Sequence, residues 1–161
     1  MRDEATGALV GAGGPGYPRA MRFYEQTMGV YFDDLDAFQI LHNARYLLLF
    51  ERTIGSFWRQ YTPSRVLTPE LDPDQYHVVR ANQLEYLRPV RGVGDVRVRI
   101  WVEKLGRTSL TFAMRVLPVD QDEVYCKGSR VIVRVNPETY RPEPWSDSFR
   151  ERIAPYVHEL Q

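Results

Sequence analysis

The sequence predicts an α+β fold, in which one curved antiparallel sheet wraps around one long, buried helix. Residues 43–61 carry apolar side chains at spacings of three and four, which indicates a helix. Four segments between residues 76 and 135 instead show the alternation that is typical of strands. A doubly wound fold would alternate strands with helices, and this order does not. A curved sheet supplies the surface against which such a helix is buried.

The elements of the N-terminal half follow from these patterns. Residues 21–32, "MRFYEQTMGVYF", alternate well enough to form a strand. Leu47, Leu48 and Leu49 add apolar groups around most of the helix, which predicts burial on nearly all sides. Gly55 costs the helix about 1 kcal/mol relative to Ala, so it predicts a close backbone approach at that point. The apolar stripe of the helix consists of Tyr46, Phe50, Ile54 (or Thr53), Phe57 and Tyr61.

The C-terminal half is predicted to be mostly strand. Residues 62–74 hold three prolines and form a loop, and residues 136–144 form a second loop. Ser146 is placed to cap a short helix over residues 147–157. The predicted strands are residues 76–88, 95–105, 110–119 and 124–135.

Length and composition indicate one soluble domain. The 161 residues suffice for one core, and we expect residues 1–20, rich in Gly, Ala and Pro, to be a disordered tail before a single domain of residues 21–161. The tail lacks the basic start and apolar segment of a secretory signal. No apolar run approaches the roughly 20 residues of a membrane span, so no membrane partner is expected.

Charge and cysteine content exclude several classes of protein. The chain has 21 Lys plus Arg and 21 Asp plus Glu, and this balance argues against a nucleic-acid partner. Cys126 is the only cysteine, which excludes an internal disulfide and fits a cytoplasmic location. Cys126 lies in a strand pattern and is expected in the core. The three histidines lack metal-ligand spacing, so no metal is expected.

The segment before the helix, "DDLDAFQILHNARY" from Asp33 to Tyr46, concentrates candidate functional groups. From the residues alone, Asp36 is first a helix-capping carboxylate that satisfies free N–H groups. The alternative is that Asp36 carries chemistry, because a carboxylate beside a helix N-terminus stands next to backbone donors and a positive dipole end.

The order of one strand, one long buried helix and four antiparallel strands resembles the hotdog fold, and more closely the 4-hydroxybenzoyl-CoA thioesterase family. The family motif is Asp-x-Asp-x-x-Gly, followed by a helix that opens near a Tyr and runs into Phe-Glu. It stands here as Asp34, Asp36, Tyr46 and Phe50-Glu51. The resemblance continues in "RPVRGVGD" and "GRTS", and it covers residues 23–135. Gln39 stands where the family usually has Gly, so it takes either an ordinary backbone conformation or reshapes the pocket entrance.

The resemblance implies roles for the residues around the helix start. Asp36 matches the family's catalytic carboxylate and becomes the nucleophile or the base for water. Asp34 would cap or orient, and Asp33 would be solvated. His42 and Asn43 are candidates for orienting water or substrate, although a histidine at a helix start is more often a capping residue. Glu51 is the alternative catalyst, because some hotdog thioesterases use a helix carboxylate.

The resemblance also implies contacts to the substrate. From charge alone, the turn between the second and third of the four strands is a solvated hairpin, but the family uses this turn to contact CoA phosphates. Arg suits that role because its guanidinium pairs with two phosphate oxygens. The expected phosphate-binding residues are Lys104, Arg107, Thr108 and Ser109. Phe38, Gln39 and Tyr46 are expected at the acyl pocket, although core packing explains the aromatic residues equally well.

The function implied by the resemblance is hydrolysis of an acyl-CoA to free acid and CoA, with CoA as part of the substrate and no further cofactor. Two alternatives remain open: a thioesterase for acyl chains bound to a carrier protein, and a non-catalytic acyl-CoA-binding hotdog protein. We expect a homodimer or homotetramer, because one sheet around one helix leaves strand edges exposed.

Overall fold

The computed structural model describes residues 22–60 and 70–158. Short 3-10 turns occur at Phe32–Asp34, Pro73–Gln75 and Ala154–Tyr156. The expected tail of residues 1–20, most of the loop of residues 62–74, and Tyr61 lie outside the described residues. The strands are β1 Tyr24–Val30, β2 His77–Tyr86, β3 Gly94–Leu105, β4 Ser109–Leu117 and β5 Cys126–Arg134, and the helices are α1 Asn43–Arg59 and α2 Asp147–Ile153.

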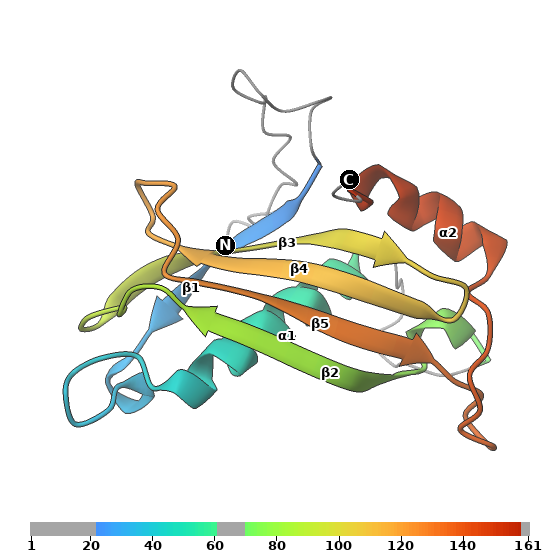
Figure 1. Cartoon of the computed structure of the whole chain (residues 1–161), viewed down its shortest axis with the longest axis horizontal. Helices are drawn as coiled ribbons and strands as arrows, with labels where there is room; N and C mark the ends of the chain where they lie inside the picture. Colours follow the sequence, from blue (N-terminus) through green and yellow to red (C-terminus); the bar gives the residue numbers. More distant parts are fainter. Residues whose placement is uncertain (1–21, 61–69, 159–161) are drawn as a thin grey trace, which may run out of the picture.

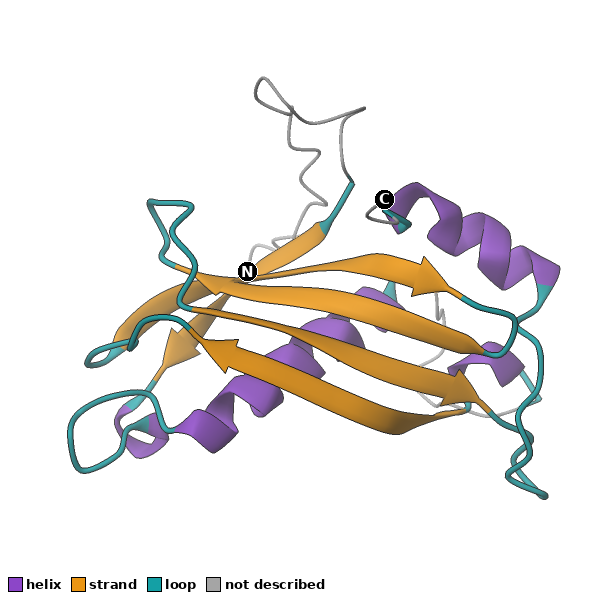
Figure 2. Ribbon diagram, in the orientation of Figure 1, coloured by secondary structure: helices purple, strands orange, loops and turns teal. Residues whose placement is uncertain are grey.

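The five strands form one antiparallel sheet in the order β1-β3-β4-β5-β2. The sheet curves around α1, which runs across its concave side (Figure 1, Figure 2). Strands β1 and β2, which flank α1 in the sequence, therefore occupy the two outer edges. The predicted α+β architecture is confirmed, and each predicted strand and helix occurs within a few residues of its expected bounds.

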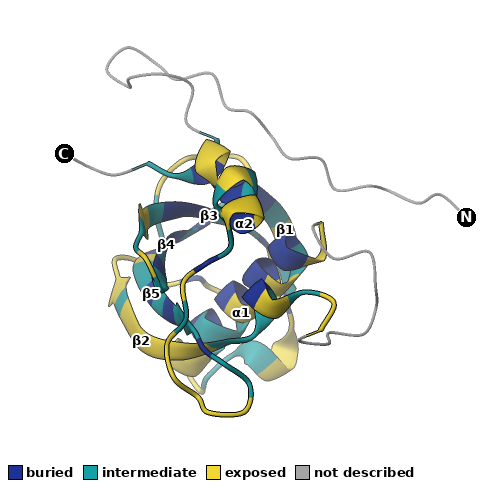
Figure 3. Cartoon of the chain, turned by 90° about the vertical axis from the view of Figure 1, so that its right-hand side faces the viewer, coloured by how far each residue is buried: buried dark blue, intermediate teal, exposed yellow. Residues whose placement is uncertain are grey.

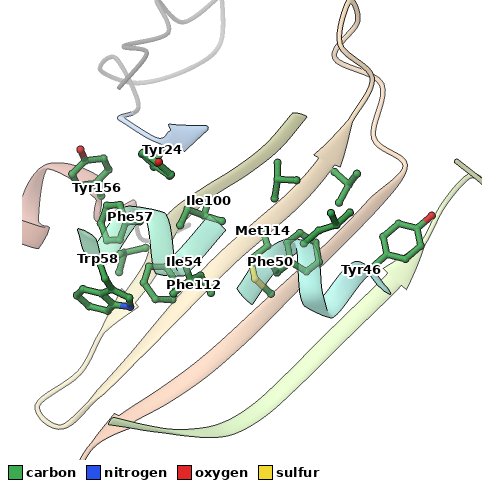
Figure 4. Close-up of a cluster of buried hydrophobic side chains, with 14 of the residues drawn as sticks. Tyr24, Tyr46, Phe50, Ile54, Phe57, Trp58, Ile100, Phe112, Met114 and Tyr156 are labelled. Atoms are coloured by element: carbon green, nitrogen blue, oxygen red, sulfur yellow. The ribbon is translucent and has the colours of Figure 1, made fainter. Parts of the chain in front are cut away.

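The core lies between α1 and the concave side of the sheet. Phe50, Ile54, Phe57 and Trp58 point from α1 toward the strands (Figure 4). Alternate residues of β3, β4 and β5 complete this layer, because side chains of a strand point to opposite faces in turn. The fully buried strand residues include Val98, Ile100, Val102, Leu110, Phe112, Met114 and Ile132.

One prediction about α1 is wrong for the single chain. The helix is not buried on all sides, because Glu51, Arg52, Gly55 and Arg59 are exposed on the side away from the sheet (Figure 3). A Cβ atom added to Gly55 would meet nothing within 4 Å, so no backbone approaches it closely within the described chain.

The two ends of the sheet are built differently. At one end, the start of α1, the end of β2 and the start of β3 come together (Figure 1). At the other end, α2 covers the turn between β3 and β4. There Arg150 donates a hydrogen bond of 2.7 Å to the carbonyl of Gly106, and the Trp145 N–H donates to the Arg107 carbonyl at 3.0 Å. Ser146 caps α2 as predicted, accepting a hydrogen bond from the Phe149 N–H at 3.1 Å.

No helix within the described ranges is both long and apolar enough to cross a bilayer. Within residues 22–60 and 70–158, no three His, Cys, Asp or Glu side chains gather as a group that could hold a metal ion.

Candidate functional site

A groove of about 500 Å³ lies at the N-terminal end of α1, between the segment that leads into the helix and the end of β2. Its lining is mainly apolar and aromatic, with one carboxylate and the exposed first residues of the helix. The lining residues are Asp36, Ala37, Phe38, Ile40, Leu41, His42, Asn43, Tyr46, Tyr86, Leu87, Arg88 and Pro89.

Asp36 is held by the backbone that follows it. Its Oδ1 accepts hydrogen bonds from the N–H groups of Phe38 at 2.8 Å and Ile40 at 3.2 Å. Its Oδ2 has no hydrogen-bond partner among the described residues. The carboxylate is thus anchored through one oxygen, while the second is free beside the groove.

Gln39 closes the same turn in a left-handed conformation, with φ of 58°. Its N–H bonds to the Asp36 carbonyl at 3.0 Å, and its carbonyl accepts from the Gly92 N–H at 2.9 Å. The sequence left open whether Gln39 takes an ordinary conformation, and it does not. The turn keeps a backbone that suits Gly, and the non-glycine residue costs about 1–2 kcal/mol there.

Asp34 holds the entry to the helix rather than facing the groove. Its Oδ2 accepts from the Tyr31 N–H at 2.9 Å, and its Oδ1 lies 3.4 Å from Nε of Arg45 in α1. This geometry fits the orienting role expected for Asp34. The Asp33 side chain is exposed and lies 4.0 Å from Arg45.

His42 caps α1. Its Nδ1 accepts a hydrogen bond from the Ala44 N–H at 3.2 Å, which leaves Nε2 exposed at the groove. The neighbouring Asn43 N–H has no partner among the described residues, and the Asn43 carbonyl accepts from the Tyr86 hydroxyl at 3.2 Å. Asn43 lines the groove, so the N-terminus of α1, where the helix dipole favours negative charge, lies at the groove.

Two tyrosines in contact line the groove. Tyr46, the first buried residue of α1, packs edge-on against Tyr86 with ring centroids 5.1 Å apart. Burial raises the pKa of Tyr46 to about 12, so its phenol stays neutral at physiological pH. In contrast, the Phe38 side chain is 80% exposed at the rim.

Glu51 lies about 12 Å further along α1 from Asn43, at 1.5 Å per residue. Its carboxylate pairs with Arg130 of β5, whose Nε donates to Asn82 Oδ1 at 2.8 Å. Arg130 is buried, whereas the Glu51 side chain is 62% exposed. Glu51 does not line the groove that holds Asp36.

The comparisons with known proteins agree with this fold. A family model described as the thioesterase superfamily matches residues 38–125, which is more than half of the chain. The chain belongs to the thioesterase superfamily. The match begins at Phe38, two residues after Asp36, so it does not include the Asp-x-Asp motif. No curated protein matches the sequence.

Solved structures, several of them named as thioesterases, share the hotdog fold of this superfamily member. A predicted thioesterase from Bacillus stearothermophilus is 23% identical, with a TM-score of 0.74 and coverage of 86% of this chain and 99% of the other. A thioesterase from Thermus thermophilus, complexed with coenzyme A and Zn, is 29% identical, with a TM-score of 0.67 and coverage of 80% and 90%. A Staphylococcus aureus protein in complex with CoA is 16% identical, with a TM-score of 0.73 and coverage of 88% and 89%.

In this superfamily member, the turn expected to bind CoA phosphates lies far from Asp36. Lys104, Arg107, Thr108 and Ser109 belong to the β3–β4 turn and its borders, at the end of the sheet that α2 covers. The segment that contains Asp36 instead pairs with Arg91, just before the start of β3, and lies at the opposite end of the sheet (Figure 1). The nine residues of β4 span about 30 Å at 3.3 Å per residue. Within one chain, the turn and Asp36 do not face the same groove, so this role stays a prediction that requires a second copy.

Cys126 is fully buried in this fold, as expected. Burial raises the pKa of its thiol to about 11, so it is protonated at neutral pH and unsuited to act as a nucleophile.

Sequence reasoning missed one wall of the groove. Tyr86, Leu87, Arg88 and Pro89 stand more than 40 residues after Asp36, and only the fold brings them to the start of α1. The Arg-Pro turn is part of the family resemblance, but no local pattern in the sequence predicts that it forms a wall of the groove.

Proposed function

We propose that this chain is an acyl-CoA thioesterase and that Asp36 is its catalytic carboxylate. The observation that supports the proposal is that Asp36, whose Oδ2 has no partner among the described residues, and Asn43, at the N-terminus of α1, line the same mainly apolar groove. Thioester hydrolysis needs a nucleophile or base, and it needs donors where the carbonyl oxygen becomes negative.

Two routes use the same oxygen. In the first, Asp36 Oδ2 attacks the thioester carbonyl, the C–S bond breaks, CoA leaves as its thiolate, and water then hydrolyses the acyl-aspartyl anhydride. In the second, Asp36 accepts a proton from a water molecule, which attacks the carbonyl while CoA leaves as before. Under both routes, the Asn43 N–H and the dipole of α1 stabilise the developing oxyanion.

The Asp36 turn favours either route because the carboxylate is already oriented. Two backbone N–H groups hold Oδ1 in place, so little rotational freedom is lost when Oδ2 meets the substrate. The exposed Nε2 of His42 lies on the same rim and would contact the leaving group or a water molecule. The resemblance to a thioesterase complexed with CoA supports CoA as the leaving group.

The working form in this proposal is at least a dimer. Strand β2 is an outer strand whose residues are almost all exposed, including Val78, Val79 and Tyr86. Such an edge pairs readily with another strand. The groove lies at the end of β2, so a second copy paired along β2 would border it.

The test is release of CoA from a panel of acyl-CoAs, measured with a thiol-trapping dye. Turnover of at least one acyl-CoA that is abolished by Asp36→Asn is the expected result. Hydrolysis of an acyl carrier protein substrate but of no acyl-CoA would replace the proposed substrate. Tight acyl-CoA binding without thiol release would identify a non-catalytic binding protein. A single turnover in ¹⁸O-labelled water tests the first route, because label in the Asp36 carboxylate marks an acyl-aspartyl anhydride that water has opened at the Asp36 carbonyl.

A further inference from the structure

A second groove of about 500 Å³ runs along the other side of α1, beside the outer strand β1. It does not share a residue with the Asp36 groove. Its lining contains two arginines and no carboxylate. The lining residues are Gln26, Thr27, Met28, Gly29, Tyr31, Arg52, Gly55, Ser56 and Arg59.

The two arginines stand on one face of the helix. Arg45, Arg52 and Arg59 recur every seven residues, which places them close to one line along α1 at intervals of about 10 Å. Arg45 is paired with Asp34 at the entry to the helix. Arg52 and Arg59, in contrast, have no ion pair or hydrogen bond among the described residues. Two unpaired guanidinium groups in a groove without carboxylates favour an anionic ligand.

Gly55 lies between these arginines and leaves the helix surface bare. Nothing stands within 4 Å of the position that a Cβ atom would take. A glycine in mid-helix costs stability, so its presence is explained if something outside the chain needs the space.

Tyr31 forms the end of the groove nearest the Asp36 segment. Its ring packs onto Gly29, where an added Cβ would approach the ring to 2.7 Å, and the residue is 64% exposed. The hydroxyl end of the ring is thus held against the backbone at Gly29, while much of the residue stays exposed. A supported, exposed aromatic ring is a surface on which a base stacks.

We propose that this groove binds the nucleotide end of CoA, with the base on Tyr31 and the phosphate groups on Arg52 and Arg59. The inference rests on the proposed function in taking CoA as the carrier of the acyl group. It assigns the phosphates to α1 rather than to the turn that contains Arg107. Tyr31 precedes Asp36 by only five residues, so the end of the groove that holds the base lies near the proposed reaction site. Because the phosphates stand between thioester and base in CoA, this placement requires CoA to bind in a folded-back conformation.

The first experiment uses adenosine 3′,5′-bisphosphate, which carries the base and phosphates but no thioester, in calorimetric titrations of the full chain. Arg52→Ala and Arg59→Ala should each raise its Kd roughly 10-fold, since a hydrogen bond to a charged group contributes on that scale. Arg141→Ala, at an exposed position in the loop before α2, is the matched control and should leave Kd unchanged. Unchanged binding in both α1 variants would overturn the inference.

Substitutions at Gly55 keep the test independent of folding. Gly55→Ala and Gly55→Glu should both melt at or above the wild-type temperature, because each residue favours helix over Gly and the site is open. Gly55→Glu should weaken bisphosphate binding at least 10-fold, whereas Gly55→Ala should change it much less. Equal binding by these two variants would contradict a phosphate site.

Kinetics separate this inference from the proposed function. With acyl-CoA, Arg52→Ala and Arg59→Ala should raise KM and leave kcat nearly unchanged, whereas acyl-pantetheine should show no difference from wild type. If acyl-CoA is hydrolysed but only Arg107→Ala raises KM, the nucleotide lies at the β3–β4 turn and the inference is wrong. If no thioester is hydrolysed but the bisphosphate still binds through Arg52 and Arg59, the nucleotide site is supported and the proposed thioesterase function is refuted.

Discussion

Replacing Asp36 by Asn separates the capping role of this residue from a chemical one. Asn is nearly isosteric, and its amide oxygen can still accept from the N–H groups of Phe38 and Ile40. Two hydrogen bonds to a charged acceptor become hydrogen bonds to a neutral one. The loss is about 1–2 kcal/mol of unfolding free energy, and the melting temperature should fall by about 2–8 °C.

The activity should fall far more than the stability. The substitution replaces the free Oδ2 by an amide NH₂, which neither attacks a thioester nor accepts a proton. If Asp36 is nucleophile or base, kcat should fall by roughly 10²–10⁴ while acyl-CoA binding is retained. The assay is thiol release under saturating acyl-CoA, with thermal melts on the same preparations.

Asp34→Asn is the control, because Asp34 binds the Tyr31 N–H and Arg45 instead of facing the groove. It should lose stability on a similar scale and retain most of its turnover. Full turnover by Asp36→Asn, together with loss of turnover by Glu51→Gln, would refute the reasoning and place the catalytic carboxylate on the helix. In that case, the pair between Glu51 and Arg130 would have to open during the reaction.

Three further predictions concern stability and assembly. Gln39→Gly should raise the melting temperature by about 2–4 °C, because it relieves a left-handed non-glycine residue, and a lower value in differential scanning calorimetry would contradict this. Burial lowers the pKa of His77 in the folded protein below its unfolded value of about 6.5. The neutral histidine is therefore fully compatible with folding above that pH, and the free energy of unfolding decreases as pH falls from about 6.5 through the folded-state pKa. His77→Phe should therefore lose less stability than wild type between about pH 7 and pH 5 in denaturant titrations. Light scattering at micromolar concentration should show at least a dimer for the wild-type chain. Val79→Lys places a charge on the exposed strand β2 and should give a smaller species. A purely monomeric wild-type chain would exclude pairing along β2.

The local elements of this protein follow from its sequence. The spacing of Tyr46, Phe50, Ile54 and Phe57 predicts α1 and the side that meets the sheet, since a helix brings residues three and four apart onto one face. Strict alternation predicts β3 in the same way, and Ser146 predicts the start of α2. These features depend on neighbours within about one or two turns of chain, so a pattern of side chains is sufficient to specify them.

The groove walls, the exposure of Gly55 and the partner of Glu51 were decided only by the tertiary structure. Strand order and direction bring Tyr86 to Asn43, and they carry Arg107 to the far end of the sheet. The left-handed Gln39 is likewise held by bonds to Asp36 and to Gly92, which stands more than 50 residues later. Contacts between distant segments depend on how the strands pair across the whole sheet, and periodicity within a segment carries no information about that pairing.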